Sequence, residues 1–242
     1  TLIESFGYDA TGNRTSQTVG GSTTSYGYAA TSHRLEQVGA QARAFDAAGN
    51  TLSGFAGSSA SFDARNRLVE ISQGGVIRQQ MNYNGRGERV LSAEGNPAPA
   101  WPTTSSGWTQ AVGVRATVYD EQGQVLATLR GGNPLRFEEI VWIDSTPVAR
   151  VESSTSAVLS VHAIMSDHLN TPRALVNAQT QGGQGPGTVV WRWRLVNQGA
   201  NGSNAFGAMA AEEDPDGNGT PVRFDLRFPG QQYDAATGLH YN

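Results

Sequence analysis

The 242-residue chain contains no cysteine. This absence excludes disulfide bonds, thiolate metal sites and thiol nucleophiles. Charge is also scarce, because Asp, Glu, Lys and Arg together make up 16% of the residues and the formal net charge is -4. Disordered chains usually need a higher net charge, and proteins that bind nucleic acid or an anionic membrane need a concentrated basic region. We therefore expect a folded protein that binds no nucleic acid.

Long hydrophobic runs are missing too. No stretch approaches the roughly 18 consecutive apolar residues that a transmembrane helix needs, so we expect no membrane span. The N-terminal residues show no basic start followed by an apolar run, which is the pattern of a signal peptide. The first residue is Thr1 rather than Met, and we expect the chain to be part of a longer protein.

A short motif recurs along the chain: an aromatic residue, then Asp or Asn, and Gly or Asn four residues after the aromatic. The copies are Tyr8-Asp9 with Gly12, Phe45-Asp46 with Gly49, Phe62-Asp63 with Asn66, Tyr83-Asn84 with Gly87, Tyr119-Asp120 with Gly123 and, with a longer turn, Tyr233-Asp234 with Gly238. Aromatic residues often precede turns in all-β proteins, so one copy would mean little. Six copies at nearly fixed offsets make coincidence improbable.

Each copy predicts a β-hairpin in which these residues have structural roles. The Asp side chain can accept backbone N–H bonds from the turn, and Gly or Asn can adopt the left-handed conformation that closes it. A single hairpin cannot bury its apolar face alone. We therefore predict that successive hairpins pair edge to edge in a continuous sheet.

The second half of the chain predicts further strands. Apolar segments at residues 137–143, 146–151 and 158–164 are typical of a β-meander. Trp191 and Trp193 alternate with arginines along another expected strand, which places both rings on one face. Stacking on nucleic acid or carbohydrate is an alternative, but we favour a packed core. We predict an all-β architecture with the hairpins at residues 1–130 and the meander at residues 131–242.

The motif resembles the YD unit of the RHS/teneurin repeat family. The resemblance is more specific near the C-terminus. There, residues 167–176 are similar to the start of the RHS-associated core, and residues 226–242, together with residues 191–193, are similar to its continuation. The resemblance implies stacked YD hairpins that form part of a spiralling hollow β-shell in a bacterial polymorphic toxin. Insecticidal toxin-complex C components and teneurin shells are related to this family.

This resemblance also implies partners and a location. The shell would enclose a C-terminal toxin domain, and the chain would contact the rest of the shell and secretion-spike or chaperone proteins. Such a protein is made in the bacterial cytoplasm and exported by a specialised system such as type VI secretion. The autoproteolytic motifs of the family follow the Gly-Leu-His-Tyr-Asn stretch that ends at Asn242. We expect those motifs beyond this chain and no catalytic residue within it.

Four acidic or amide residues near the C-terminus match a calcium-binding loop. Asp214, Asp216, Asn218 and Asp225 occupy its first, third, fifth and twelfth positions, with Gly219 at the sixth. The last position is Asp rather than the longer Glu, so bidentate reach is doubtful, and strands rather than helices are expected on either side. We favour a turn between strands and keep Ca²⁺ as the alternative. No other cofactor is expected.

The histidines give no catalytic pattern. No second His or Glu stands at helical spacing from His168, and no Gly-x-Ser-x-Gly motif accompanies it. We predict packing or hydrogen-bonding roles for His168 and His240.

Two other classes of function stay open. One is an extracellular adhesion or carbohydrate-binding module, since YD repeats also resemble those of surface proteins. The other is a self-processing aspartyl-type autoprotease, if the native chain continues beyond Asn242.

Overall fold

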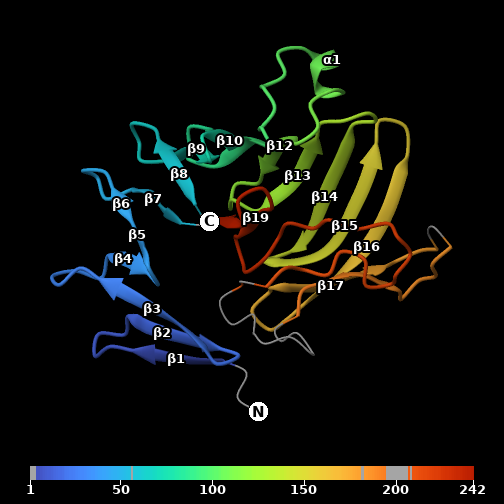
Figure 1. Ribbon diagram of the computed structural model, residues 1–242. Coiled ribbons are helices and arrows are strands. Elements are labelled where there is room, and N and C mark those ends of the chain that lie inside the picture. The colour runs from blue at the N-terminus through green and yellow to red at the C-terminus, as the bar shows by residue number, and fades with distance from the viewer. Residues whose placement is uncertain (1–3, 56, 181–182, 195–206, 208) are drawn as a thin grey trace. The chain divides into compact units, whose positions relative to one another are not determined.

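The computed structural model describes residues 4–55, 57–180, 183–194, 207 and 209–242. The chain divides into two compact units (Figure 1). The first unit comprises Thr1–Val76 and Arg194–Met209, and the second comprises Ile77–Trp193 and Ala210–Asn242. The strands pair antiparallel, and within the described residues the only helix is α1 (Ser105–Trp108). The all-β prediction is therefore confirmed.

The described residues of the first unit form nine short strands, each hydrogen-bonded to a strand next to it along the chain. They are β1 (Glu4–Tyr8), β2 (Arg14–Val19), β3 (Ser22–Tyr28), β4 (Leu35–Val38), β5 (Gln41–Ala42), β6 (Ala44–Phe45), β7 (Thr51–Phe55), β8 (Ser58–Phe62) and β9 (Leu68–Gln73). Strands β1 to β5 form one sheet in sequence order, and β6 to β9 also follow one another as neighbours. Sequential pairing of this kind is what stacked hairpins predict.

The second unit holds longer strands in the same sequential order. They are β10 (Val76–Tyr83), β11 (Arg89–Glu94), β12 (Val114–Tyr119), β13 (Val125–Arg130), β14 (Arg136–Ile143), β15 (Thr146–Ser154), β16 (Val158–Ser166), β17 (Pro172–Asn177) and β18 (Val189–Arg192). A separate hairpin of β19 (Gln232–Asp234) and β20 (Leu239–Tyr241) lies near the C-terminus. Strands β14, β15 and β16 form the predicted meander. The predicted change of repeat type near residue 130 stays a prediction.

The turns of the YD motif share one hydrogen-bond pattern. A side-chain oxygen of the Asp or Asn accepts the backbone N–H groups two and four residues later, at 2.8–3.1 Å. The accepting residues are Asp9, Asp46, Asp63, Asn84, Asp120 and Asp167. The residue three positions after each is Gly or Asn with positive φ, for example Gly49 at 90° and Asn66 at 59°. Two donors on one oxygen fix the turn, and the left-handed residue closes it.

Two copies depart from the predicted motif. Asp167 forms the same turn although Ser166 precedes it, so the aromatic residue is dispensable. Asp234 does not accept the N–H bonds of its own turn. That turn is one residue longer, and the Thr237 and Gly238 N–H groups donate to the Asp234 carbonyl oxygen instead. The Asp234 carboxylate is therefore available for a distant partner.

An aromatic cluster forms the core of the second unit. Trp191 and Trp193 are buried, with exposed fractions of 0% and 1%. The Trp191 ring meets Phe224 edge to face at 5.3 Å, and the Trp193 ring meets Phe228 at 5.2 Å. Edge-to-face pairs of this kind add to the stabilisation from area burial. The packed-core interpretation of the two tryptophans is confirmed, and the cluster attaches the C-terminal segment (Ala210–Asn242) to the sheet.

Candidate functional site: a charged pocket on the sheet of the second unit

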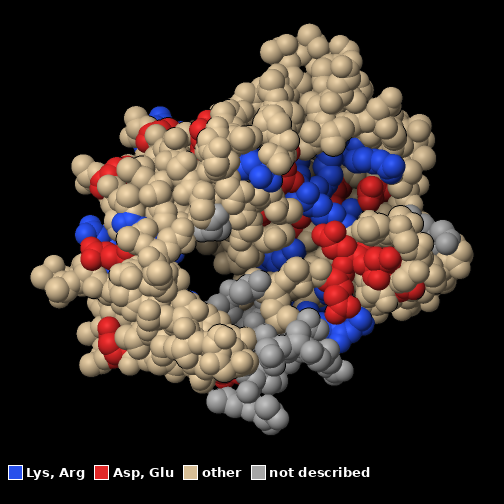
Figure 2. Space-filling view, in the orientation of Figure 1, with Lys and Arg blue, Asp and Glu red and all other residues tan. Residues whose placement is uncertain are grey.

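Charged side chains alternate along one face of the sheet. They occur at every second residue near one end of two strands, namely Arg136 and Glu138 in β14 and Arg150 and Glu152 in β15. The cross-strand register places Glu138 opposite Glu152. Because side chains two residues apart share a face, all four project from the same side of the sheet. Figure 2 shows that basic and acidic side chains gather in a hollow on this unit.

The C-terminal segment adds the remaining members of a buried ion-pair network. Asp225 accepts from Arg115 at 2.9 Å and from Arg130 at 3.3 Å, and its other oxygen accepts from Arg223 at 2.9 Å. Glu94 also pairs with Arg115 and, at 2.8 Å, with Arg223. Asp225 therefore connects the segment to strands β12 and β13.

Two acids of this network, Asp225 and Glu138, stay ionised. Burial alone would raise the pKa of the Asp225 carboxyl, but Arg115, Arg130 and Arg223 outweigh it and hold the pKa well below its usual range. Burial opposes ionisation of Glu138 in the same way, and Arg130 and Arg150 hold its pKa below the ordinary value. These two carboxylates are thus negatively charged at neutral pH.

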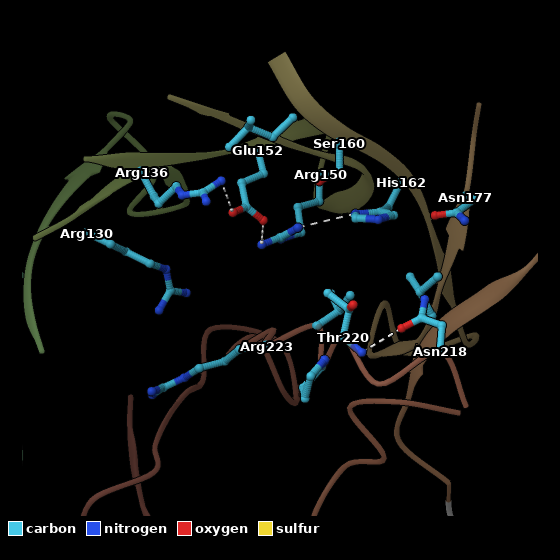
Figure 3. A pocket seen from close by; sticks show the side chains of 14 residues that line it. Arg130, Arg136, Arg150, Glu152, Ser160, His162, Asn177, Asn218, Thr220 and Arg223 are labelled. Carbon is cyan, nitrogen blue, oxygen red and sulfur yellow. Dashed lines mark hydrogen bonds and ion pairs between the residues drawn. The ribbon is translucent and has the colours of Figure 1, made fainter. Parts of the chain in front are cut away.

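A pocket of about 550 Å³ opens beside this network. Figure 3 shows Arg130, Arg136 and Arg150 on the sheet side, with Arg223 and Thr220 of the C-terminal segment facing them. Arg150 donates to Glu152 at 2.8 Å and lies 3.3 Å from His162. Burial, together with the neighbouring Arg150, lowers the pKa of His162 to about 4, so this imidazole is neutral at pH 7. The pocket is therefore positively lined but contains its own carboxylate, Glu152.

A second pocket, of about 360 Å³, has the last two residues of the chain, Tyr241 and Asn242, in its lining. It is lined mainly by apolar and aromatic residues, among them Trp142, Phe228 and Tyr241. The Trp142 indole donates to the Val125 carbonyl oxygen at 2.8 Å, and Gln232 donates to the Tyr119 hydroxyl at 3.0 Å. Burial raises the pKa of Tyr119 to about 12, so its hydroxyl stays protonated. This pocket offers rings and neutral hydrogen-bonding groups, together with the charged side chains of Glu88 and Arg227.

The candidate calcium residues are used in other contacts. Asp214 accepts the backbone N–H groups of Asn218 and Gly219 at 3.0 and 3.1 Å, and the Asn218 side chain donates to Asp216 at 2.8 Å. Asp225 is engaged by arginines on both oxygens. In the described part of the chain, no group of three or more His, Cys, Asp or Glu residues is arranged to hold a metal ion. These contacts favour the turn, and Ca²⁺ binding stays a prediction.

The histidines differ from one another in environment. His168 is exposed in the Asp167 turn, which contradicts a packing role; a hydrogen-bonding role, the other half of the prediction, stays a prediction. His240 packs against Tyr233, with ring centroids 5.3 Å apart, as predicted. The charged network itself was missed in the sequence. The signal that could have found it is the alternation of Arg and Glu at every second residue of the β14 and β15 strands.

Taken together, these features define a repetitive antiparallel β-protein whose C-terminal segment is fixed to the sheet by buried ion pairs and aromatic packing. No protein-family model and no curated protein matches the sequence. Among solved structures, the Photorhabdus luminescens Tc holotoxin pore with a mutated TccC3 has a TM-score of 0.65 at 16% identity, over 98% of this chain and 11% of that chain. TcdB2-TccC3 without its hypervariable C-terminal region has a TM-score of 0.64, and TcdB2-TccC3-TEV one of 0.63, at the same identity and coverage.

These matches show that the chain has the fold of a part of the Tc toxin chains. It spans about one ninth of their length. No helix among the described residues is long and apolar enough to cross a membrane.

Proposed function

We propose that this chain is a section of the wall of an RHS-type β-shell, which encloses a C-terminal effector for delivery into other cells. The observation that carries the proposal is the likeness in fold to Tc toxin chains over 98% of the chain. The repeated YD turns and the sequential strand pairing support it, since stacked hairpins can extend a sheet without limit. In such a protein the chain has no catalytic turnover and acts by enclosing its cargo.

The C-terminal segment of the chain is attached to the sheet of the second unit. Buried ion pairs through Asp225 and aromatic packing through Phe224 attach the segment to the sheet. We propose that this attachment closes the wall next to the enclosed domain, and that secretion-spike or chaperone proteins bind elsewhere. Export from a bacterium by a specialised secretion system is part of the same proposal.

Protease protection in the full-length protein tests the proposal. We expect a fragment downstream of residue 242 to resist proteinase K while the wall is intact and to be digested after Phe224→Ala loosens the C-terminal segment. Val112→Ala, at a side chain that is 74% exposed, is the matched control and should leave the fragment protected. The absence of any protected fragment from the unaltered protein would contradict enclosure.

Carbohydrate binding is a second candidate because of the aromatic and amide groups in the 360 Å³ pocket. Aromatic rings and neutral hydrogen-bonding side chains are a suitable surface for a sugar. A glycan array decides between the two functions: selective binding that Trp142→Ala abolishes favours an adhesion module, and no binding favours the shell.

Autoprocessing is tested by mass spectrometry of a chain extended beyond Asn242, where a single internal cut is expected.

A further inference from the structure

Three arginines stand side by side on neighbouring strands of the second unit. The register pairs Arg115 of β12 with Arg130 of β13, and Arg130 with Arg136 of β14. Directly opposed residues have Cβ atoms about 5 Å apart, and like charges at this spacing destabilise a sheet. The arrangement therefore needs compensating anions.

The compensation is uneven along this row. Arg115 pairs with two carboxylates, Glu94 and Asp225. Arg130 reaches Glu138 and Asp225, each at 3.3 Å and with the same Nη2 atom. Arg136 has a single ion pair among the described residues, with Glu152 at 3.6 Å, and its side chain is 42% exposed. Arg130 and Arg136 therefore keep N–H donors that face the 550 Å³ pocket (Figure 3).

The whole network carries one surplus positive charge. Its members are Arg115, Arg130, Arg136, Arg150, Arg223, Glu94, Glu138, Glu152 and Asp225. Five arginines face four carboxylates, although the chain as a whole has a formal charge of -4. The neighbouring His162 is neutral at pH 7 and does not change this balance. One additional monoanion would neutralise the network.

We propose that Arg130 and Arg136 form a binding site for the carboxylate of an Asp or Glu side chain, supplied by an acidic polypeptide segment that enters this pocket. Guanidinium groups donate two parallel hydrogen bonds to a carboxylate, and the chain contains no lysine, so every basic side chain offers this geometry. Neutral residues such as Val222 and Asn177 also line the pocket and can contact the backbone of the segment.

A peptide carboxylate fits this pocket better than phosphate or nucleic acid. The network has one surplus positive charge, which one carboxylate neutralises and a phosphate dianion exceeds. Nucleic acid needs many phosphate contacts along a basic surface, and a single surplus charge does not provide them. The inference concerns a site in this chain alone and does not depend on the shell.

Titration calorimetry of the 242-residue chain with end-blocked tetraglutamate at low salt tests the site. We expect binding that Arg136→Gln weakens about tenfold or more, since charge-assisted hydrogen bonds are lost. Arg34→Gln is the matched control, because Arg34 is 50% exposed and also pairs with one acid, Glu36, at 2.7 Å. It should leave the affinity unchanged, and end-blocked tetraglutamine should not bind.

Two further measurements separate binding from a structural role. Glu152→Gln removes the carboxylate that competes for Arg136, so tetraglutamate should bind about threefold more tightly. Arg136→Gln also removes a like charge opposite Arg130 and should not lower the melting temperature. The proposal is overturned if Arg136→Gln leaves tetraglutamate binding unchanged, or if inorganic phosphate binds as tightly as the peptide and displaces it.

Discussion

Arg89 donates from Nη1 to Oδ2 of Asp234 at 2.6 Å, across 145 residues of sequence, and both side chains are only 5% exposed. Arg89 also lies over the Tyr241 ring at 4.5 Å, and its backbone N–H donates to the Tyr241 hydroxyl at 3.0 Å. One residue of β11 therefore holds both strands of the β19–β20 hairpin. The pair connects the sheet directly to the C-terminal hairpin.

Replacing Asp234 by alanine should strongly destabilise the second unit. Removal of one member of a buried ion pair leaves an uncompensated charge and typically costs about 3–5 kcal/mol. All five tryptophans lie in this unit, so urea unfolding followed by Trp fluorescence measures its free energy of unfolding directly. Glu36→Ala breaks the exposed Arg34–Glu36 pair and is the control, with an expected cost below about 1 kcal/mol. Equal costs for the two variants would show that Asp234 has no special role.

The YD turn predicts a difference between two substitutions of Asp63. The Oδ1 atom of Asp63 accepts the N–H groups of Arg65 and Arg67 at 2.8 and 3.0 Å. Asp63→Ala removes both bonds and should destabilise the hairpin, whereas Asp63→Asn keeps an acceptor and should destabilise it less. The natural Asn84 forms the same turn, which supports the second expectation. Hydrogen exchange over β8 and β9 measures the effect, because the first unit contains no tryptophan. Equal exchange in the two variants would contradict the capping role.

Acid should weaken the hairpins of the first unit. The hydrogen bond from the Arg67 side chain, with backbone N–H groups and the Arg67 charge, lowers the pKa of Asp63 to about 2. The side-chain amide of Asn13, which donates to Asp9, lowers the pKa of Asp9 to about 2. In the unfolded chain the pKa of an Asp is about 3.9. The stabilisation of the turns by these carboxylates is therefore complete above about pH 4 and is lost as the pH falls toward about 2. Hydrogen exchange or circular dichroism, measured between about pH 5 and pH 2, should follow this loss of stability. Asp63→Asn should make the stability of the β8–β9 hairpin less dependent on pH. An unchanged pH dependence in this variant would contradict the role of the Asp63 carboxylate.

The turns could be predicted from sequence because their interactions are local. The Asp63 oxygen and its donors lie within four residues of one another, so residue type and spacing contain the whole hydrogen-bond pattern. The strands could be predicted for the same reason, since alternation over a few residues determines which side chains share a face.

The alternation of Arg and Glu could have indicated the sheet side of the pocket, but its contacts with the C-terminal segment could not be predicted, because those partners are distant in the chain. Asp225 looked like the last ligand of a calcium loop with Asp214, but in the fold it meets Arg115, 110 residues away. Asp234 looked like another turn cap, yet one extra residue in its turn freed the carboxylate for Arg89. The docking of the C-terminal segment decides both roles, and no local pattern encodes it.

Phe224 should be the residue on which that docking depends most. Its side chain is fully buried and meets the buried Trp191 ring edge to face at 5.3 Å. Truncation of a buried Phe to Ala removes apolar contacts and leaves a cavity, at a typical cost of about 3–5 kcal/mol. Because Asp225 is the next residue, the loss should also loosen its ion pairs with Arg115 and Arg130. We expect Phe224→Ala to increase hydrogen exchange across residues 211–228 while strands β14 and β15 stay protected. Val222→Ala, at a partly buried neighbour of the same cluster, is the control and should have a smaller effect. Uniform exposure of the whole second unit, with no selective change in the segment, would show that the segment and the sheet unfold as one body.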